Sequence, residues 1–261
     1  MKKSLLDVLF ASDKRKNVLL FLQDGPKEMD FLLSSLETTR QALLPQIRIL
    51  EDHHLVIQLD DSYELTAIGE IIVDEMRPLL DTLEVFDNNV EYWGNRNLDF
   101  IPSHLLERTR ELGKCNVRKP HPTDICALDK KTLEDAYNSR NHYAICAYYH
   151  AGMPEVFSKT IRNGVDTYFI VTQDVMDKIL TENHDDFAEF TRNKLFHMFV
   201  YPEELGFISF VCTDYGVLMR MIDISGNPDY VRVEFAAPEA LEWGKDLFEH
   251  FMKCSKPITE I

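Results

Sequence analysis

The pattern of apolar and polar positions predicts several short helices and one hairpin in the first 66 residues. The helices are expected to begin at residue types that suit a helix start, namely Ser4, Ser12, Pro26 and either Thr38 or Thr39. In the last of these helices Leu43, Ile47 and Leu50 recur at spacings of four and three, which gives a core-facing stripe. The segments Leu55–Leu59 and Tyr63–Thr66 flank a short polar turn and predict the hairpin.

The order of these elements indicates a DNA-binding module. Helix, turn, helix and hairpin are typical of a winged helix-turn-helix, whose second helix enters the major groove. Arg40 and Gln41 lie in the first turn of that helix, from which side chains reach base edges. We therefore predict that residues 1–66 bind double-stranded DNA. The alternative is a helical hairpin whose β-ribbon packs against a partner.

A long helical pattern follows from Ala67 to about Trp93. Its apolar residues are spaced four or three apart, close to a heptad seam: Ile68, Ile72, Met76, Leu79, Leu83, Phe86, Val90 and Trp93. Pro78 is expected to kink this helix or divide it in two. The seam either packs onto the chain's own domains or joins two copies, and we predict that residues 67–95 link the domains and form a homodimer.

Strands and helices alternate in the remaining part, residues 96–261. A helix over Ile101–Leu112, stopped by Gly113, precedes this alternation, and Pro238 opens a last helix. Strands are expected at Tyr143–Tyr149, Asp166–Val171, Lys194–Val200, Phe207–Cys212, Val217–Asp223 and Tyr230–Phe235, and helices at Pro154–Arg162, Gln173–Leu180 and Asp186–Asn193. This order predicts an α/β domain with a mixed sheet, so that the whole chain is α+β or α/β.

Composition and charge narrow the class of protein only slightly. The net charge of −16 opposes general nucleic-acid affinity, but residues 1–50 carry +2 and the rest −18, which permits DNA binding through that end. The five cysteines are far apart and form no C-x-x-C pair, so we expect neither a disulfide framework nor a metal site. No export signal and no membrane span are recognisable, and we expect a cytoplasmic protein.

Four phrases of the sequence together resemble a known family. They are LLPQIRILEDHHLV (43–56), YELTAIGEIIVDEMRPLLDTLEVFDNNVEYW (63–93), IPSHLLERTRELG (101–113) and PEALEWGKDLFEHF (238–251). The chain resembles the archaeal winged-helix transcriptional regulators of methanogens, which carry a methanogenesis-regulator-type domain after the DNA-binding head. The resemblance implies a sequence-specific regulator whose second domain is a sensor of a small-molecule effector. That domain is also similar, more faintly, to the phospholipase-D-like sensor domains of other archaeal regulators.

The resemblance places the DNA-reading residues at the start of the second helix. They are Thr38, Thr39, Arg40 and Gln41, with Gln46 and Arg48 further along, and Lys14 and Lys27 are candidate phosphate contacts. The sequence departs from a generic winged helix at three places. Pro45 lies inside the second helix, His54 occupies a helix end that often needs a left-handed residue, and the hairpin tip carries acidic Asp60-Asp61.

The sequence contains none of the catalytic motifs that were considered. A phospholipase-D-like enzyme needs a His-x-Lys pair, and none of the nine histidines has lysine two residues later. Metalloprotease, phosphate-loop and serine-hydrolase motifs are also missing. We therefore expect no catalytic residue and no cofactor. The alternative is an acidic α/β enzyme of phosphodiester or small-molecule type whose helical head serves oligomerisation.

A ligand site is expected where the first strand of the alternating region ends. Ligands of open α/β sheets bind beyond the carboxyl ends of strands, which makes Tyr148, Tyr149 and His150 candidate contacts. Arg220 is a candidate contact for an anion, although it could instead pair with Asp223. The alternative for the aromatic residues is ordinary packing at the rim of the core.

Overall fold

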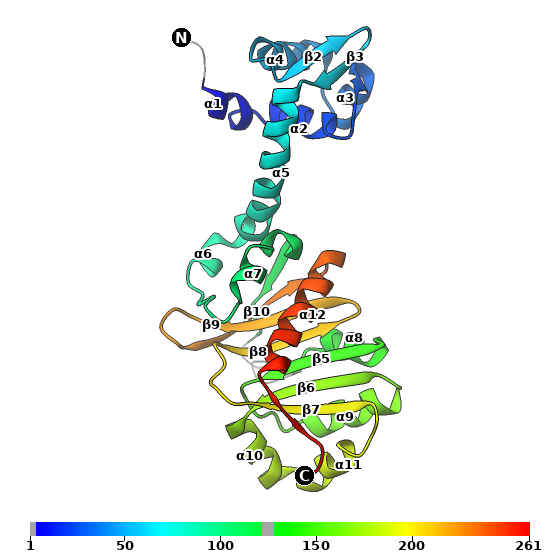
Figure 1. Ribbon diagram of the computed structural model, residues 1–261, viewed down its shortest axis with the longest axis vertical. Coiled ribbons are helices and arrows are strands. Elements are labelled where there is room, and N and C mark those ends of the chain that lie inside the picture. Colours follow the sequence, from blue (N-terminus) through cyan, green and yellow to red (C-terminus); the bar gives the residue numbers. More distant parts are fainter. Residues whose placement is uncertain (1–3, 122–127) are drawn as a thin grey trace. The chain divides into compact units, whose positions relative to one another are not determined.

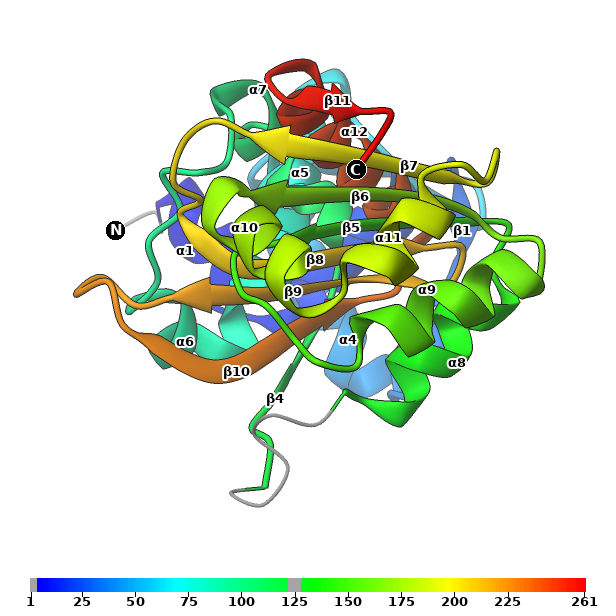
Figure 2. The ribbon, with the colours of Figure 1, turned by 90° about the horizontal axis from the view of Figure 1, so that it is seen from below.

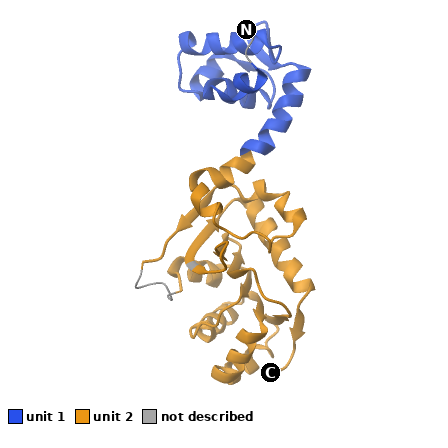
Figure 3. Ribbon diagram, turned by 90° about the vertical axis from the view of Figure 1, so that its left-hand side faces the viewer, with its two compact units in different colours: residues 1–80 blue, residues 81–261 orange. Residues whose placement is uncertain are grey.

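A computed structural model describes residues 4–121 and 128–261 of the chain. The chain divides into two compact units, Met1–Leu80 and Asp81–Ile261, which Figure 3 shows in different colours. Cys126 of the sequence analysis lies outside the described residues.

Unit 1 contains short helices and a small antiparallel sheet. Its elements are α1 (Leu5–Phe10), α2 (Asp13–Leu22), β1 (Lys27–Glu28), α3 (Met29–Ser35), α4 (Arg40–Asp52), β2 (Val56–Leu59) and β3 (Ser62–Leu65), with sheet order β1-β3-β2 (Figure 1). The predicted caps Ser4 and Ser12 are confirmed, because their side chains accept hydrogen bonds from the first turns of α1 and α2. The cap predicted for α4 is wrong as to its hydrogen bond, because Thr39 occupies the cap position but its side chain accepts none. The predicted stripe of α4, Leu43, Ile47 and Leu50, is completely buried.

Pro26 does not open a helix, and that prediction is wrong. The two residues after it form β1, in which Lys27 and Glu28 pair with Tyr63 and Ser62 of β3. The helix α3 therefore begins only at Met29. A two-residue strand has no periodicity of its own, so only its pairing partner far along the chain makes it a strand.

The helices α3 and α4 each end in a turn of the same type. Glu37 and His54 have left-handed φ angles of 47° and 57°. The next residue in each case closes the turn, because Thr38 N donates to Leu33 O at 3.1 Å and Leu55 N donates to Leu50 O at 3.0 Å. This is the hydrogen-bond pattern that usually has glycine at the left-handed position. The left-handed conformation expected at His54 is thus confirmed.

The linking segment is one long helix followed by two short ones. The helix α5 (Ala67–Phe86) runs through Pro78, so division at that proline is wrong, and the interruption lies instead at η1 (Asp87–Asn89), before α6 (Val90–Trp93). The predicted seam is also uneven. Met76 and Trp93 are buried, whereas the side chains of Leu79 and Leu83 are 49% and 48% exposed.

Unit 2 is built on one mixed sheet, with the order β11-β7-β6-β5-β8-β9-β10-β4 among the described residues. Its strands are β4 (Cys115–Arg118), β5 (Asn141–Cys146), β6 (Asp166–Thr172), β7 (Phe196–Tyr201), β8 (Phe207–Thr213), β9 (Gly216–Ile222), β10 (Pro228–Phe235) and β11 (Lys256–Ile258). Its other helices are α7 (Ser103–Leu106), η2 (Thr109–Leu112), α8 (Lys130–Asn138), α9 (Met153–Arg162), α10 (Gln173–Glu182), α11 (His184–Phe190) and α12 (Pro238–Lys253). The strands β5, β6 and β7 are parallel and the remaining pairs antiparallel, as a mixed sheet requires.

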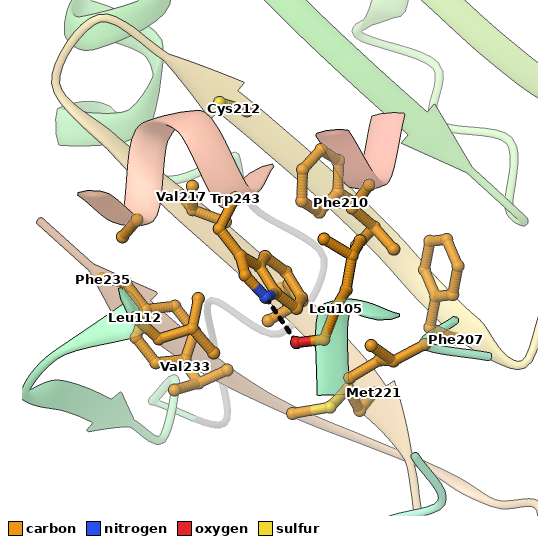
Figure 4. Close-up of a cluster of buried hydrophobic side chains, with 14 of the residues drawn as sticks. Leu105, Leu112, Phe207, Phe210, Cys212, Val217, Met221, Val233, Phe235 and Trp243 are labelled. Carbon is orange, nitrogen blue, oxygen red and sulfur yellow. Dashed lines mark hydrogen bonds between the residues drawn. The ribbon is translucent and has the colours of Figure 1, made fainter. Parts of the chain in front are cut away.

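Helices cover both faces of this sheet, as Figure 2 shows. On one face α9, α10 and α11 pack around Phe157, Phe169 and Phe187, and on the other α12 packs on β5, β8 and β9. Trp243 of α12 is fully buried there and donates its indole N–H to Leu105 O at 2.9 Å (Figure 4). Alternate residues of each central strand therefore enter different cores, which explains the continuous apolar runs of these strands.

Two predicted elements of unit 2 are shorter than expected. The helix predicted over residues 101–112 is broken into α7 and η2, although Gly113 does end it with a φ angle of 61°. The first strand of the alternating region ends at Cys146 rather than Tyr149, so Tyr148, Tyr149 and His150 lie in the connection to α9.

Candidate nucleic-acid interface and ligand cavity

The start of α4 presents polar side chains to solvent. Thr39, Arg40, Gln41 and Arg48 are exposed and Thr38 is half-buried, whereas the apolar stripe of the same helix is buried. Thr39 precedes the helix in extended conformation, and its side chain makes no capping hydrogen bond. The N-terminal end of a helix carries partial positive charge from its unpaired N–H groups. Arg40 adds a full charge at the same place, so this surface can attract anions and donate hydrogen bonds.

Gln46 is engaged inside unit 1. The buried Arg15 donates to Gln46 Oε1 at 2.6 Å, and its other nitrogens donate to Val8 O at 2.6 Å and Asp7 O at 3.0 Å. Arg15 thereby joins the end of α1 to the middle of α4. Helical spacing placed Gln46 off the apolar stripe and among the DNA-reading residues, because spacing along one helix does not reveal a partner on another helix.

The two predicted phosphate contacts lie on other elements of unit 1. Lys14 is half-buried on α2, and Lys27 is half-buried on β1, with Nζ 3.5 Å from Asp24 O and 5.3 Å from the centre of the Phe31 ring. A surface depression beside Arg40 is lined by acidic side chains, among them Glu28, Asp30 and Asp61. These carboxylates repel phosphate, so general attraction to nucleic acid is weakened around Arg40.

In unit 2 three of the four predicted ligand residues line one cavity. Tyr148, His150 and Arg220 meet there, and Arg220 Nη1 donates to Tyr148 Oη at 2.9 Å. The pairing of Arg220 with Asp223 does not form, since the Asp223 carboxylate accepts from the backbone of its own turn. Tyr149 points elsewhere, and its hydroxyl donates to Asn183 Oδ1.

The walls of this cavity come from alternate residues of the sheet and from α8 and α9. His142, Ala144 and Cys146 contribute from β5, while Ser209 and Leu218 contribute from β8 and β9. His142, Cys146 and Ser209 were not predicted as lining residues from the sequence. The period of two along β5 was the available signal, because residues 142, 144 and 146 must share one face of a strand.

Burial sets the protonation of the groups in the cavity. His142 is 4% exposed, and burial lowers the pKa of its imidazole to about 4. Burial also raises the pKa of the Cys146 thiol to about 12. Both groups are therefore neutral near pH 7. Within the described part of the chain, His142 Nδ1 and Arg220 Nε are buried and have no hydrogen-bond partner.

Asp129 is the acidic group among the described residues of the cavity wall. Burial alone would raise the pKa of Asp129, but the N–H of Thr132 and the charge of Arg232, 3.1 Å away, outweigh it and lower the pKa. Asp129 is thus ionised and neutralises Arg232.

Residues 4–121 and 128–261 contain neither a cluster of metal ligands nor a membrane-spanning helix. No group of three or more His, Cys, Asp or Glu side chains there is arranged to hold a metal ion. Nor is any helix of these residues both long and apolar enough to cross a membrane.

Two solved structures are distantly similar to the chain. TrmBL2, described as an archaeal chromatin protein with a novel mode of DNA binding, is 14% identical, with 97% of each chain covered and a TM-score of 0.44. Nuc from Salmonella typhimurium, a phospholipase D family member, is 8% identical, covering 56% of this chain and 99% of its own, with a TM-score of 0.40. Both scores are too low to establish a shared fold.

Sequence comparison is more specific. The methanogenesis regulatory protein FilR1 of Methanothrix harundinacea (strain 6Ac) is 23% identical over 258 residues, which are 97% of this chain but only 58% of that relative. The family model of the FilR1 N-terminal domain matches residues 3–84, and that of the FilR1 middle domain matches residues 126–253. The two models together match more than half of the chain, which therefore belongs to the FilR1 family of methanogenesis regulatory proteins.

Proposed function

We propose that this protein is a sequence-specific DNA-binding transcriptional regulator. The observation that carries the proposal is the exposed polar start of α4 on a unit of helices followed by a β-hairpin. The match of this unit to the FilR1 N-terminal domain, and the name of the relative as a regulatory protein, support the same function.

We infer that unit 1 is a winged helix-turn-helix with α4 as its recognition helix. In this arrangement α3 and α4 form the helix-turn-helix, and β2 with β3 forms the wing. Arg40 can donate two hydrogen bonds to a guanine edge, and Gln41 can pair with adenine. Thr38, Thr39 and Arg48 are further candidate DNA-reading residues, and Lys14 and Lys27 are candidate phosphate contacts. Gln46 acts indirectly in this arrangement, since it fixes α4 through Arg15.

The proposed organisation has three parts. Residues 1–66 bind DNA, residues 67–95 link and dimerise, and residues 96–261 act as an effector domain that binds a small molecule without transforming it. Exposed apolar residues at helical spacing on α5, among them Ile68, Ile71, Leu79 and Leu83, support a homodimer. The cavity with Tyr148, His150 and Arg220 supports a ligand site. A dimer would present two recognition helices to a palindromic operator.

The DNA-binding part is tested by replacing Arg40. Fragments that the wild-type protein selects from genomic DNA supply the operator, and anisotropy titrations measure affinity for it and for unrelated duplexes. Arg40→Ala is expected to cost about 1–3 kcal/mol on the operator and to relax base preference at one position.

Arg162→Ala is the matched control, since it removes the same charge from an exposed position on α9 of unit 2. It should leave base preference unchanged. An unaltered operator footprint with Arg40→Ala would contradict the assignment of α4 as the recognition helix.

A further inference from the structure

We propose that the cavity of unit 2 binds a small organic monocarboxylate with an apolar body, and that its carboxylate lies against Arg220. The proposal rests on the proposed function only in assigning a regulatory role to this ligand. The site itself follows from the charges, the unpaired donors and the wall of the cavity.

The net charge of the side chains around the cavity favours a ligand with one negative charge. Cys146, Ser209, Arg220 and Arg232 stand opposite one another on β5, β8, β9 and β10, so they form one row across the sheet. Arg232 is neutralised by Asp129 at 3.1 Å. Arg220 therefore remains as the cation of the cavity without an acidic partner among the described residues. One excess positive charge fits a monoanion better than a phosphate dianion.

The guanidinium of Arg220 is held in place and still has donors to offer. The bond from Nη1 to Tyr148 Oη fixes its orientation, while Nε is buried and has no partner among the described residues. A buried donor that is left without a partner costs free energy, and arginine meets carboxylates with two parallel hydrogen bonds. A carboxylate at this point supplies both the counter-charge and the missing acceptor.

The rest of the cavity wall is formed mainly by apolar side chains and extends along β5. Its larger apolar side chains include Leu128, Leu133, Val156, Phe157, Phe169 and Leu218. His142 lines the cavity four residues before Cys146 on β5, which places the two Cα atoms roughly 13 Å apart at the rise of a strand. The neutral His142 has an unpaired Nδ1 buried at that far end. An apolar body suits the wall between His142 and Arg220, whereas a sugar or polyol would leave its hydroxyls unsatisfied.

Calorimetric titration of the full-length protein tests the proposal with matched pairs of ligands. Phenylacetate and hexanoate are compared with phenylacetamide and hexanamide, which have the same bodies and no charge. Both acids are expected to bind about ten-fold or more tightly than their amides, since hydrogen bonds between charged groups are the stronger ones. Arg220→Gln should abolish this preference.

Arg162→Gln removes an equal charge outside the cavity and should keep the preference for acids. The wild-type comparison of acid with amide needs no variant, so it decides the matter even if Arg220→Gln does not fold. Binding of neither acid at millimolar concentration would overturn the proposal. Equal affinity for acids and amides, or tighter binding of phenyl phosphate, would overturn it as well.

The same titrations separate the site from its regulatory role. Acid binding is measured without DNA, and operator affinity is measured with and without phenylacetate. If the acid binds and operator affinity stays constant, the cavity is assigned correctly and the effector role in the proposed function fails. If the operator binds and no acid does, the DNA-binding function stands and the ligand class is wrong.

Discussion

Among single residues, Gly69 occupies a helical position at which alanine, usually preferred in helices, is unfavourable. A Cβ atom at this position of α5 would lie 2.1 Å from Leu55 O, which is far inside van der Waals contact. That carbonyl also accepts from Thr66 N at 3.1 Å, so it cannot move away freely. Alanine normally stabilises a helix over glycine by about 1 kcal/mol.

Gly69→Ala is instead expected to destabilise unit 1 by roughly 1–3 kcal/mol, because the start of α5 must shift away from the hairpin. Chemical denaturation followed by circular dichroism measures the effect. Gly94→Ala is a control with a roomier position, where the new Cβ would lie 3.2 Å from Val90 O. Equal or higher stability of the Gly69 variant would contradict the close approach.

His142 makes the stability of the protein depend on pH. Its pKa is about 4 in the folded protein, against an ordinary value of 6.5, because it is buried. The unfolded chain therefore takes up a proton at His142 as pH falls below that ordinary value, and the folded chain does not. Stability from this residue is fully present at neutral pH and is lost progressively as pH falls toward the folded pKa.

The variant His142→Leu should remove this dependence. The loss of unfolding free energy between neutral pH and about pH 4 is expected to be smaller than in the wild type, by an amount on the order of 3 kcal/mol. Denaturation at a series of pH values measures it. Parallel profiles for the two proteins would mean that His142 is solvated or paired in its charged form.

For single residues, the sequence predicts the backbone conformation better than it predicts the side-chain contacts. The sequence places His54 at a helix end that often needs a left-handed residue, and its φ angle is indeed 57°. Gln46 could not be placed, since its partner Arg15 comes from another helix. Tyr148 and His150 were predicted as ligand contacts because they follow the end of a strand. Arg220 lies on β9, and the position of strand ends could not predict that it lines the same cavity.

At the scale of elements, α4 contains an interior proline, which is unfavourable in a helix. Pro45 is exposed and follows the first turn, so its missing N–H leaves Gln41 O without its usual helical donor. Pro45→Ala is expected to raise the unfolding free energy of unit 1, by up to about 3 kcal/mol. Thermal melting measures this change, and a lower melting temperature would contradict the expectation.

The effect of Pro45→Ala on operator affinity is a separate readout. Affinity should fall if the proline shapes α4 for the groove, and it should stay constant if α4 merely tolerates it. Pro78→Ala is the comparison variant, because Pro78 also lies inside a helix, outside the proposed recognition helix.

Elements with strong periodicity were predicted from sequence and weakly patterned ones were not. The strands β6, β8 and β9 and the helices α9 and α12 agree with prediction, because long apolar runs or stripes define them. The elements that were missed are β1, β4, α8 and β11. The three strands among them are short and depend on pairing with distant segments, which no local pattern records. The break after Phe86 was missed because the apolar spacing continues through it.

For the whole molecule, the exposed apolar side chains of α5 predict self-association. Leu79 and Leu83 are about half exposed, so a charged residue there is tolerated by the monomer but would be buried without a partner in a dimer. Leu83→Glu is expected to sediment as a folded monomer and to lose operator affinity, whereas the wild type sediments as a dimer.

Leu180→Glu is the matched control, since Leu180 is 39% exposed on α10 and lies outside the proposed dimer segment. It should sediment as the wild type does. A monomeric wild type at micromolar concentration would contradict the dimer. An unfolded Leu83→Glu would place Leu83 in the protein's own core.

The two edges of the large sheet differ from strands on which another copy of the chain could pair. An unpaired strand edge is a template on which further copies can add, and long apolar edges lead to fibres. Among the described residues the edges are β11, with three residues including Pro257, and β4, with four residues ending in Arg118. Proline offers no N–H and arginine resists burial, so neither edge supports the addition of another strand. The apolar strands β5 to β9 thereby lie inside the sheet, between two short edges that give a further strand little to pair with.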